Sequence, residues 1–131
     1  MKKLILRIRN KSLILKLRET ETAYFISNAV PISSYVSTWG EEIYFNTNLS
    51  IEKDNDAKDV VQFGEIAFWT EGSSIAIGFG RTPVSKEDEI RLAAPCNIWA
   101  DSDFEKKFFE DIRDGGEVFL DKYWFNDEVI C

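Results

Sequence analysis

The first part of the chain alternates apolar and polar residues with a period of two. Residues 4–8 and 13–17 each carry three apolar residues at alternate positions: Leu4, Leu6 and Ile8, then Leu13, Leu15 and Leu17. Such alternation is typical of strands that bury one face. A two-residue turn at Asn10-Lys11 would place Ile8 opposite Leu13 and all six apolar side chains on one face of a hairpin.

Two segments have helical spacing instead. Thr20 predicts the N-cap of a short helix that Pro31 ends. A second helix is predicted after Ser102, because Ser102 and Glu105 have the spacing of a capping box. The apolar positions of their buried faces are Ala23, Ile26 and Val30 in the first helix and Phe104, Phe108 and Ile112 in the second.

Most of the remaining chain is predicted to form strands. Residues 32–45 are expected to be extended with a bend near Gly40, and residues 46–59 to form a polar surface connection. The clearest hairpin joins residues 65–70 to residues 73–79 through a turn at Glu71-Gly72, which pairs Phe68 with Ile75. Further strands are predicted at 89–93, 97–100 and 117–123.

The second face of the 65–79 hairpin places large residues beside small ones. It carries Trp69, Ala67, Ala76 and Gly78. This pattern predicts either close packing against another element or a shallow concavity on the outer surface.

These elements predict a mainly β protein, a closed antiparallel barrel of about eight strands with two short capping helices. The 131 residues suit one domain, 1–131. Hydrophobic residues make up 44% and aromatic residues 14%, which suits a small β core with large side chains.

Charge and residue usage exclude several classes of function. Sixteen Lys and Arg residues against 23 Asp and Glu give a net charge of −7, so nucleic acid is not an expected partner. The sequence contains no histidine, which excludes Ser-His and Cys-His nucleophiles and removes the commonest transition-metal ligand. No catalytic constellation, metal site or cofactor is predicted, and whether the chain is an enzyme stays open.

The expected location is the cytoplasm. Cys96 and Cys131 are too few and too far apart for a disulfide framework, so both thiols are expected to be free. Arg7 and Arg9 interrupt the apolar run that would make a signal peptide, and no stretch has the ~20 apolar residues of a membrane span. A membrane partner is therefore not expected.

Short blocks along nearly the whole chain carry a further signal: Thr22-Ala23, Ala29-Val30-Pro31, Thr38 to Phe45, Gly64 to Trp69, Ile77 to Ser85, and Asp88 to Pro95. In this order they resemble a family of small prokaryotic cyclophilin-like proteins. The resemblance implies an eight-stranded antiparallel barrel closed by two helices, in agreement with the count of elements above.

The wider cyclophilins are peptidyl-prolyl isomerases, and the resemblance weakens at the residues for that activity. Their catalytic arginine follows a Phe-His pair after the first helix, where this chain reads Tyr35-Val36-Ser37-Thr38-Trp39. Their Gly-Ser-Gln-Phe-Phe segment is most similar to Gly72-Ser73-Ser74-Ile75-Ala76, which lacks the pocket glutamine and both phenylalanines. Efficient isomerase activity is therefore not expected.

The candidate ligand-binding residues are Trp39, Tyr44, Trp69, Phe79 and Arg81. Aromatic residues with an arginine would suit a carboxylate or a peptide. The alternative is that the aromatic residues belong to the core and Arg81 to a surface ion pair. Two functions stay open: a peptide- or small-ligand-binding module, and a weak peptidyl-prolyl isomerase.

Three acidic residues and one thiol are weaker candidates for chemistry. Glu41-Glu42 and Glu65 could supply a carboxylate pair, although chance pairs are expected among so many acids. Cys96 is expected to fill a small buried space, because no histidine can activate it.

Overall fold

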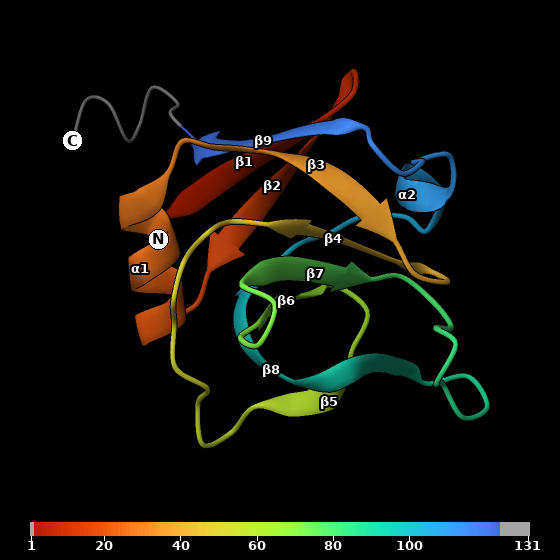
Figure 1. The fold of residues 1–131 in the computed structure, drawn as a ribbon. Helices are drawn as coiled ribbons and strands as arrows, with labels where there is room; N and C mark the ends of the chain where they lie inside the picture. The colour runs from red at the N-terminus through yellow and green to blue at the C-terminus, as the bar shows by residue number, and fades with distance from the viewer. Residues whose placement is uncertain (1, 124–131) are drawn as a thin grey trace.

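The computed structural model describes residues 2–123, which form nine strands and two helices (Figure 1). In chain order the elements are β1 (Lys3–Ile8), β2 (Lys11–Leu17), α1 (Glu21–Ala29), β3 (Ile32–Thr38), β4 (Glu42–Asn46), β5 (Lys58–Val61), β6 (Glu65–Trp69), β7 (Ser74–Gly78), β8 (Ile90–Asp101), α2 (Lys107–Glu110) and β9 (Glu117–Lys122).

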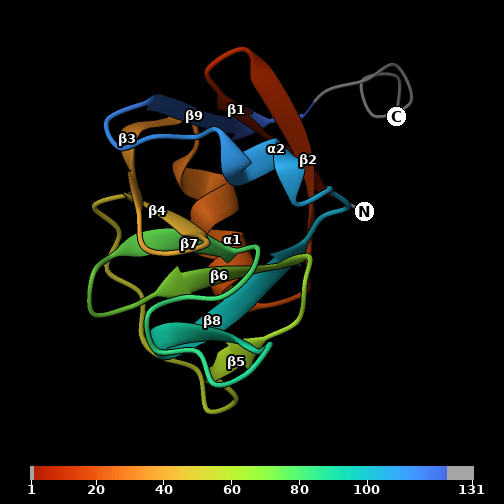
Figure 2. The ribbon, with the colours of Figure 1, turned by 90° about the vertical axis from the view of Figure 1, so that its right-hand side faces the viewer.

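Eight of these strands close into a ring. Their order is β2-β1-β9-β3-β4-β7-β6-β8, every pair is antiparallel, and a short β2–β8 pairing through Leu17 and Ala100 completes the circuit. Helices α1 and α2 lie at opposite ends of the ring (Figures 1 and 2). The predicted mainly β architecture, with about eight strands in closed order and two short helices, is confirmed.

The ring encloses the main hydrophobic core. The alternate apolar residues of β1 and β2 point into it, as predicted, and Leu4, Leu6, Ile8 and Leu15 are almost completely buried. The predicted turn is wrong by one position. Ile8 pairs with Lys11, so the turn is Arg9-Asn10. The resulting shift of two residues in register keeps each side chain on its predicted face.

The predicted N-terminal cap is present in helix α1 and absent in helix α2. The hydroxyl oxygen of Thr20 accepts a hydrogen bond from the Ala23 amide at 3.0 Å, so the predicted N-cap of α1 is confirmed. The predicted capping box is wrong: α2 begins only at Lys107, and the Ser102 hydroxyl instead donates to the Ile14 carbonyl at 2.6 Å. Ser102 thus links the end of β8 to β2.

The strands predicted at 89–93 and 97–100 are one long strand, β8. Its second half pairs with β6 in the ring, while its first half pairs with β5, whose first two residues fall within the predicted surface connection 46–59. The register slips between Lys58 and Val60, where β8 accommodates Pro95 in a bulge.

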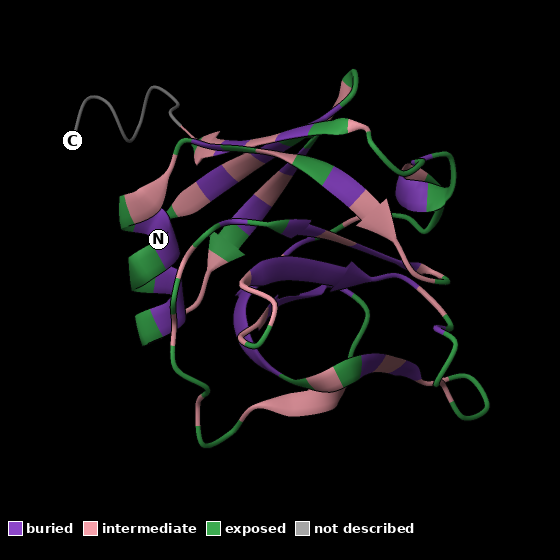
Figure 3. Cartoon of the chain, in the orientation of Figure 1, coloured by how far each residue is buried: buried purple, intermediate pink, exposed green. Residues whose placement is uncertain are grey.

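The first half of β8, together with β5, covers the outer face of β6 and β7. A second, smaller core forms there, so β7 is buried along its whole length (Figure 3). Its buried members are Val61, Ala67, Ala76, Ile90, Leu92, Cys96 and Ile98. This packing decides between the alternatives for the large-beside-small face: most of it is packed against another element, and its margin stays open as a pocket.

None of the helices in residues 2–123 is both long enough and apolar enough to cross a membrane.

Candidate functional site

An aromatic pocket of about 260 Å³ lies at the margin of the second core. It is formed by the β3–β4 turn, the outer faces of β4, β6 and β7, and the first half of β8. Its lining residues are Trp39, Glu42, Tyr44, Trp69, Ala76, Leu92, Ala93 and Cys96. Three of the five predicted ligand-binding residues, Trp39, Tyr44 and Trp69, are therefore brought together.

Two of the walls meet above β7. Tyr44 on β4 pairs with Ala76 on β7, and Trp69 on β6 pairs with Ser74 on the same strand. Because the residues of β7 between them are small, the two rings lean together and meet edge to face, with centroids 6.2 Å apart and planes at 89°. They form two perpendicular walls over the Ala76 floor.

The third aromatic wall depends on the turn between β3 and β4. The Trp39 amide donates to the Glu42 carbonyl at 2.9 Å, and Gly40 adopts φ 61° in this turn. A Cβ at Gly40 would lie 2.9 Å from the carbonyl oxygen of Arg81. Only glycine tolerates both the left-handed backbone and this close approach, so the turn fixes where Trp39 stands.

Glu42 brings a buried carboxyl into this aromatic pocket. The residue is only 6% exposed, and among the described residues its Oε1 atom has no hydrogen-bond partner. Burial raises the pKa of Glu42 to about 7. The Cys96 thiol, on the facing strand, donates to the Ala94 carbonyl at 3.2 Å. Burial and the nearby charge of Glu42 raise the pKa of Cys96 to about 12, which makes it a poor nucleophile.

The other two predicted ligand-binding residues lie outside the pocket. Phe79 follows Gly78 on β7 and so points to the opposite face, where it is buried in the main core and stacks on Phe109 at 5.4 Å. Arg81 is exposed, and its guanidinium donates to the Ser85 carbonyl at 3.4 Å. The cation that favoured a carboxylate ligand is thus absent from the described lining residues.

The carboxylate pair considered from the sequence is not formed. Glu41 makes an ion pair with Lys106 at 2.9 Å, while Glu65 accepts from Arg18 and Lys58 on another part of the ring. Burial alone would raise the pKa of Glu65, but hydrogen bonds from the Gln62 amide, Lys58 and Arg18 outweigh it and hold that pKa below its ordinary value. Within residues 2–123 no three His, Cys, Asp or Glu residues are grouped to hold a metal.

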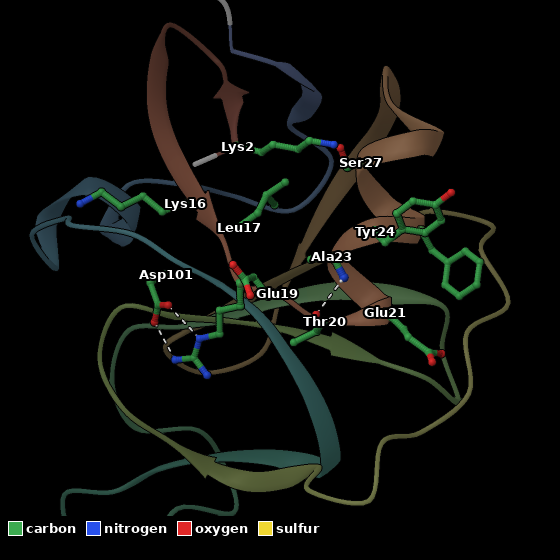
Figure 4. Close-up of a pocket in the computed structure, with 12 residues that line it drawn as sticks. Lys2, Lys16, Leu17, Glu19, Thr20, Glu21, Ala23, Tyr24, Ser27 and Asp101 are labelled. Atoms are coloured by element: carbon green, nitrogen blue, oxygen red, sulfur yellow. Dashed lines mark hydrogen bonds and ion pairs between the residues drawn. The ribbon is translucent and has the colours of Figure 1, made fainter. Parts of the chain in front are cut away.

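A second, larger concavity lies between β2, the end of β8 and α1. Figure 4 shows Asp101 and Tyr24 on opposite sides of this groove. Arg18 also lines this groove. Its guanidinium group donates two hydrogen bonds to Asp101, at 2.7 and 2.8 Å, and a third to Glu65. These charged groups satisfy one another, so they do not require a ligand.

Comparison with known proteins places this geometry in a family. A cyclophilin-like family model matches residues 2–121, nearly the whole described chain. The chain belongs to the cyclophilin-like family. The solution structure of a hypothetical protein from Archaeoglobus fulgidus superposes on this cyclophilin-like chain with a TM-score of 0.80 and 33% sequence identity, covering 93% of this chain and 95% of that one. A search of curated proteins gave no match.

In this cyclophilin-like fold, Thr38 lies in the segment where the wider cyclophilins carry the catalytic arginine, and its hydrogen-bond donors are already engaged within the protein. Both the backbone amide and the hydroxyl of Thr38 donate to Asp114 Oδ1 at 2.7 Å. Neither Ser37 nor Thr38 lines the aromatic pocket. The neutral donors available in this strand are therefore not aimed at a ligand there.

Sequence reasoning missed the role of Glu42 and the contribution of β8. A signal for Glu42 existed: it shares a face of β4 with Tyr44, and both lie opposite small residues of β7, Gly78 and Ala76. No comparable signal identified Leu92, Ala93 and Cys96, because their place depends on how β8 folds over the sheet.

Proposed function

We propose that this cyclophilin-like protein is a binding module for a small ligand or a peptide side chain, and that the aromatic pocket is its site. The observation that carries the proposal is the Glu42 carboxyl, which lies among aromatic walls with its Oε1 unpartnered within residues 2–123. A buried polar atom without a partner costs about 1–3 kcal/mol, which a hydrogen-bonding ligand would recover.

The shape and lining of the pocket support the same function. Ligand sites are typically apolar concavities with few polar groups, and this one joins three aromatic residues to one carboxyl. Its volume of about 260 Å³ is below the roughly 300–1,000 Å³ of pockets for drug-sized ligands. The pocket therefore suits one chemical group, such as a side chain or headgroup, with the rest of the ligand outside.

A purely structural role would leave the same residues as the edge of a core, and the two roles can be separated by NMR. We would record amide and indole ¹H–¹⁵N spectra during a screen of small compounds and short peptides. Binding should shift the indole signals of Trp39 and Trp69 and leave that of Trp99, fully buried in the main core, unchanged.

Two variants complete this test. Trp69→Leu should abolish the shifts, whereas Tyr35→Ala, which removes an exposed ring from β3 outside the pocket, should not affect them. A screen in which every ligand shifts only residues of the groove beside α1, or in which none shifts the pocket, would contradict the assignment.

A further inference from the structure

The inference concerns the chemical class of the ligand and rests on the proposed function above. The pocket combines an unpartnered buried carboxyl oxygen with three half-buried aromatic rings. Each feature alone is compatible with many ligands. Together they narrow the class of ligand, because the carboxyl and the aromatic rings both favour a ligand with a positive charge.

Among the described residues that line the pocket, Glu42 carries the buried polar atom that lacks a partner. Glu42 pairs with Gly78 across β4 and β7, and Ile90 from β8 lies over Gly78, so the surroundings of the carboxyl are apolar. No described residue donates a hydrogen bond to its Oε1. A buried carboxylate is stabilised chiefly by a positive charge or by donated hydrogen bonds, neither of which the described part of the chain supplies here.

The aromatic walls favour the same kind of ligand. The face of an aromatic ring carries partial negative charge and attracts cations within about 6 Å of its centroid. Tyr44 and Trp69 are half-buried and perpendicular, and Trp39 adds a third half-buried ring. Perpendicular rings beside a carboxylate form the kind of cage that holds alkylated ammonium groups.

The wider charge distribution supports a cation and opposes an anion. No Lys or Arg side chain from residues 2–123 lines the pocket. Cations on neighbouring elements are engaged elsewhere: Lys53 with Glu71, Lys58 with Glu65, and Arg91 with Glu89 and Asp59. With a net charge of −7, the molecule attracts positive ligands at long range.

We infer that the aromatic pocket binds an alkylammonium group, with the carboxylate of Glu42 as the counter-charge and the rings of Trp39, Tyr44 and Trp69 as the walls. The group can be the headgroup of a free small molecule or the methylated end of a lysine side chain. Both present the same compact cation to the pocket.

The test compares ligands that differ only in charge. At pH 8, above the pKa of Glu42, choline would be titrated against 3,3-dimethylbutan-1-ol, its neutral isostere, while the indole signals of Trp39 and Trp69 are followed. Choline should bind at least about tenfold more tightly. A second arm compares a short peptide containing trimethyllysine with the same peptide containing acetyllysine, and distinguishes a peptide source from a free amine.

Two matched variants assign the effect. Glu42→Gln keeps the shape and removes the charge, so it should weaken choline by about tenfold or more and leave the neutral alcohol unaffected. Glu117→Gln, an exposed position on β9, should change neither. If the neutral isostere binds the pocket as tightly as choline, the alkylammonium inference is wrong while the binding function stands. If no cation or neutral compound shifts the pocket signals, both are wrong.

Discussion

The indole ring of Trp69 lies so close to the backbone of Gly72 that a Cβ there would come within 2.2 Å of two ring carbons. The turn between β6 and β7 therefore packs against this ring, which also meets Tyr44 edge to face. Because Trp69 is one wall of the aromatic pocket, a residue outside the pocket controls the shape of that pocket.

Gly72→Ala should displace this indole. We expect a changed Trp69 indole signal, weaker ligand binding, and a loss of about 1–3 kcal/mol in the free energy of unfolding from overpacking. The control is the same substitution in a Trp69→Ala background, where no ring remains to clash and the added methyl should cost little. Equal costs in both backgrounds, measured by urea unfolding, would show that the contact is unimportant.

The sequence predicted strand faces better than strand registers. In the β6–β7 hairpin both were predicted correctly, because Glu71-Gly72 left little choice of turn and Phe68 does pair with Ile75. In the first hairpin the pairing moved by two residues. A shift of two leaves the same side chains facing the core, so hydrophobic alternation cannot distinguish the two registers.

Features that depend on contacts between segments distant in the chain could not be predicted from local sequence patterns. Two separate strands were predicted at 89–93 and 97–100, yet β8 continues through Pro95, which lacks an amide hydrogen, because the ladder with β5 bulges there. The same fold of β8 supplies one side of the pocket. The large-beside-small face was predicted for Trp69 because it shares a face of the β6–β7 hairpin with Ala76. The burial of Glu42 depends instead on the layer that β8 adds over the sheet.

Gly78 is another position where the fold leaves no room for a side chain. A Cβ there would lie 2.4 Å from Cγ2 of Ile90, the residue that covers it from β8. Gly78→Ala should cost about 1–3 kcal/mol of stability, and Gly78→Leu more, because the added atoms push β8 from the sheet. Combining Gly78→Ala with Ile90→Ala should recover part of that cost; strict additivity in urea unfolding would argue against the contact.

Cys96 should be a free but unreactive thiol. It is 1% exposed, and burial raises its pKa to about 12, so almost no thiolate exists at pH 8. In the native protein a thiol reagent should leave Cys96 unmodified over the time in which the unfolded chain reacts fully. Denatured, non-reduced protein should give two thiols, including Cys131, which lies outside the described residues. Rapid native modification of Cys96 would mean that the second core opens readily.

Peptidyl-prolyl isomerase activity should be close to the uncatalysed rate. The amide barrier of about 18–20 kcal/mol is lowered when a donor is aimed at the twisted peptide nitrogen. Here the Thr38 hydroxyl already donates its hydrogen bond to Asp114, and Arg81 lies outside the pocket, so neither is aimed at a ligand there. Absence of a charged donor typically costs about a hundred- to thousandfold in rate. A protease-coupled assay on Ala-Pro peptides measures this, and turnover like that of an authentic cyclophilin, lost in Arg81→Ala, would make Arg81 the catalytic group.

Glu42 makes stability depend on pH in a direction opposite to that of most carboxylates. Its pKa is about 7 in the folded protein against an ordinary value of 4.5, because burial disfavours the charged form. Between these values the folded state holds a proton that the unfolded state has released. Folding is therefore favoured at low pH. The free energy of unfolding falls as the pH rises from 4.5 to about 7, and the loss is complete once Glu42 is ionised in the folded state as well.

Glu42→Gln removes this titration while keeping the side-chain shape. The variant should gain about 2–3 kcal/mol relative to the wild type when the pH is raised from 5 to 8, measured as the difference in free energy of urea unfolding. Cys96, the other buried ionisable group here, stays protonated across that range. Glu117→Gln serves as the control, because it removes an exposed carboxyl on β9 outside the pocket. Saturating choline should reverse the trend, because a bound cation stabilises the ionised carboxylate that burial opposes. A difference between Glu42→Gln and wild type that is constant with pH would mean that the carboxyl is already paired or hydrated, and would remove the reason for a cation in the pocket.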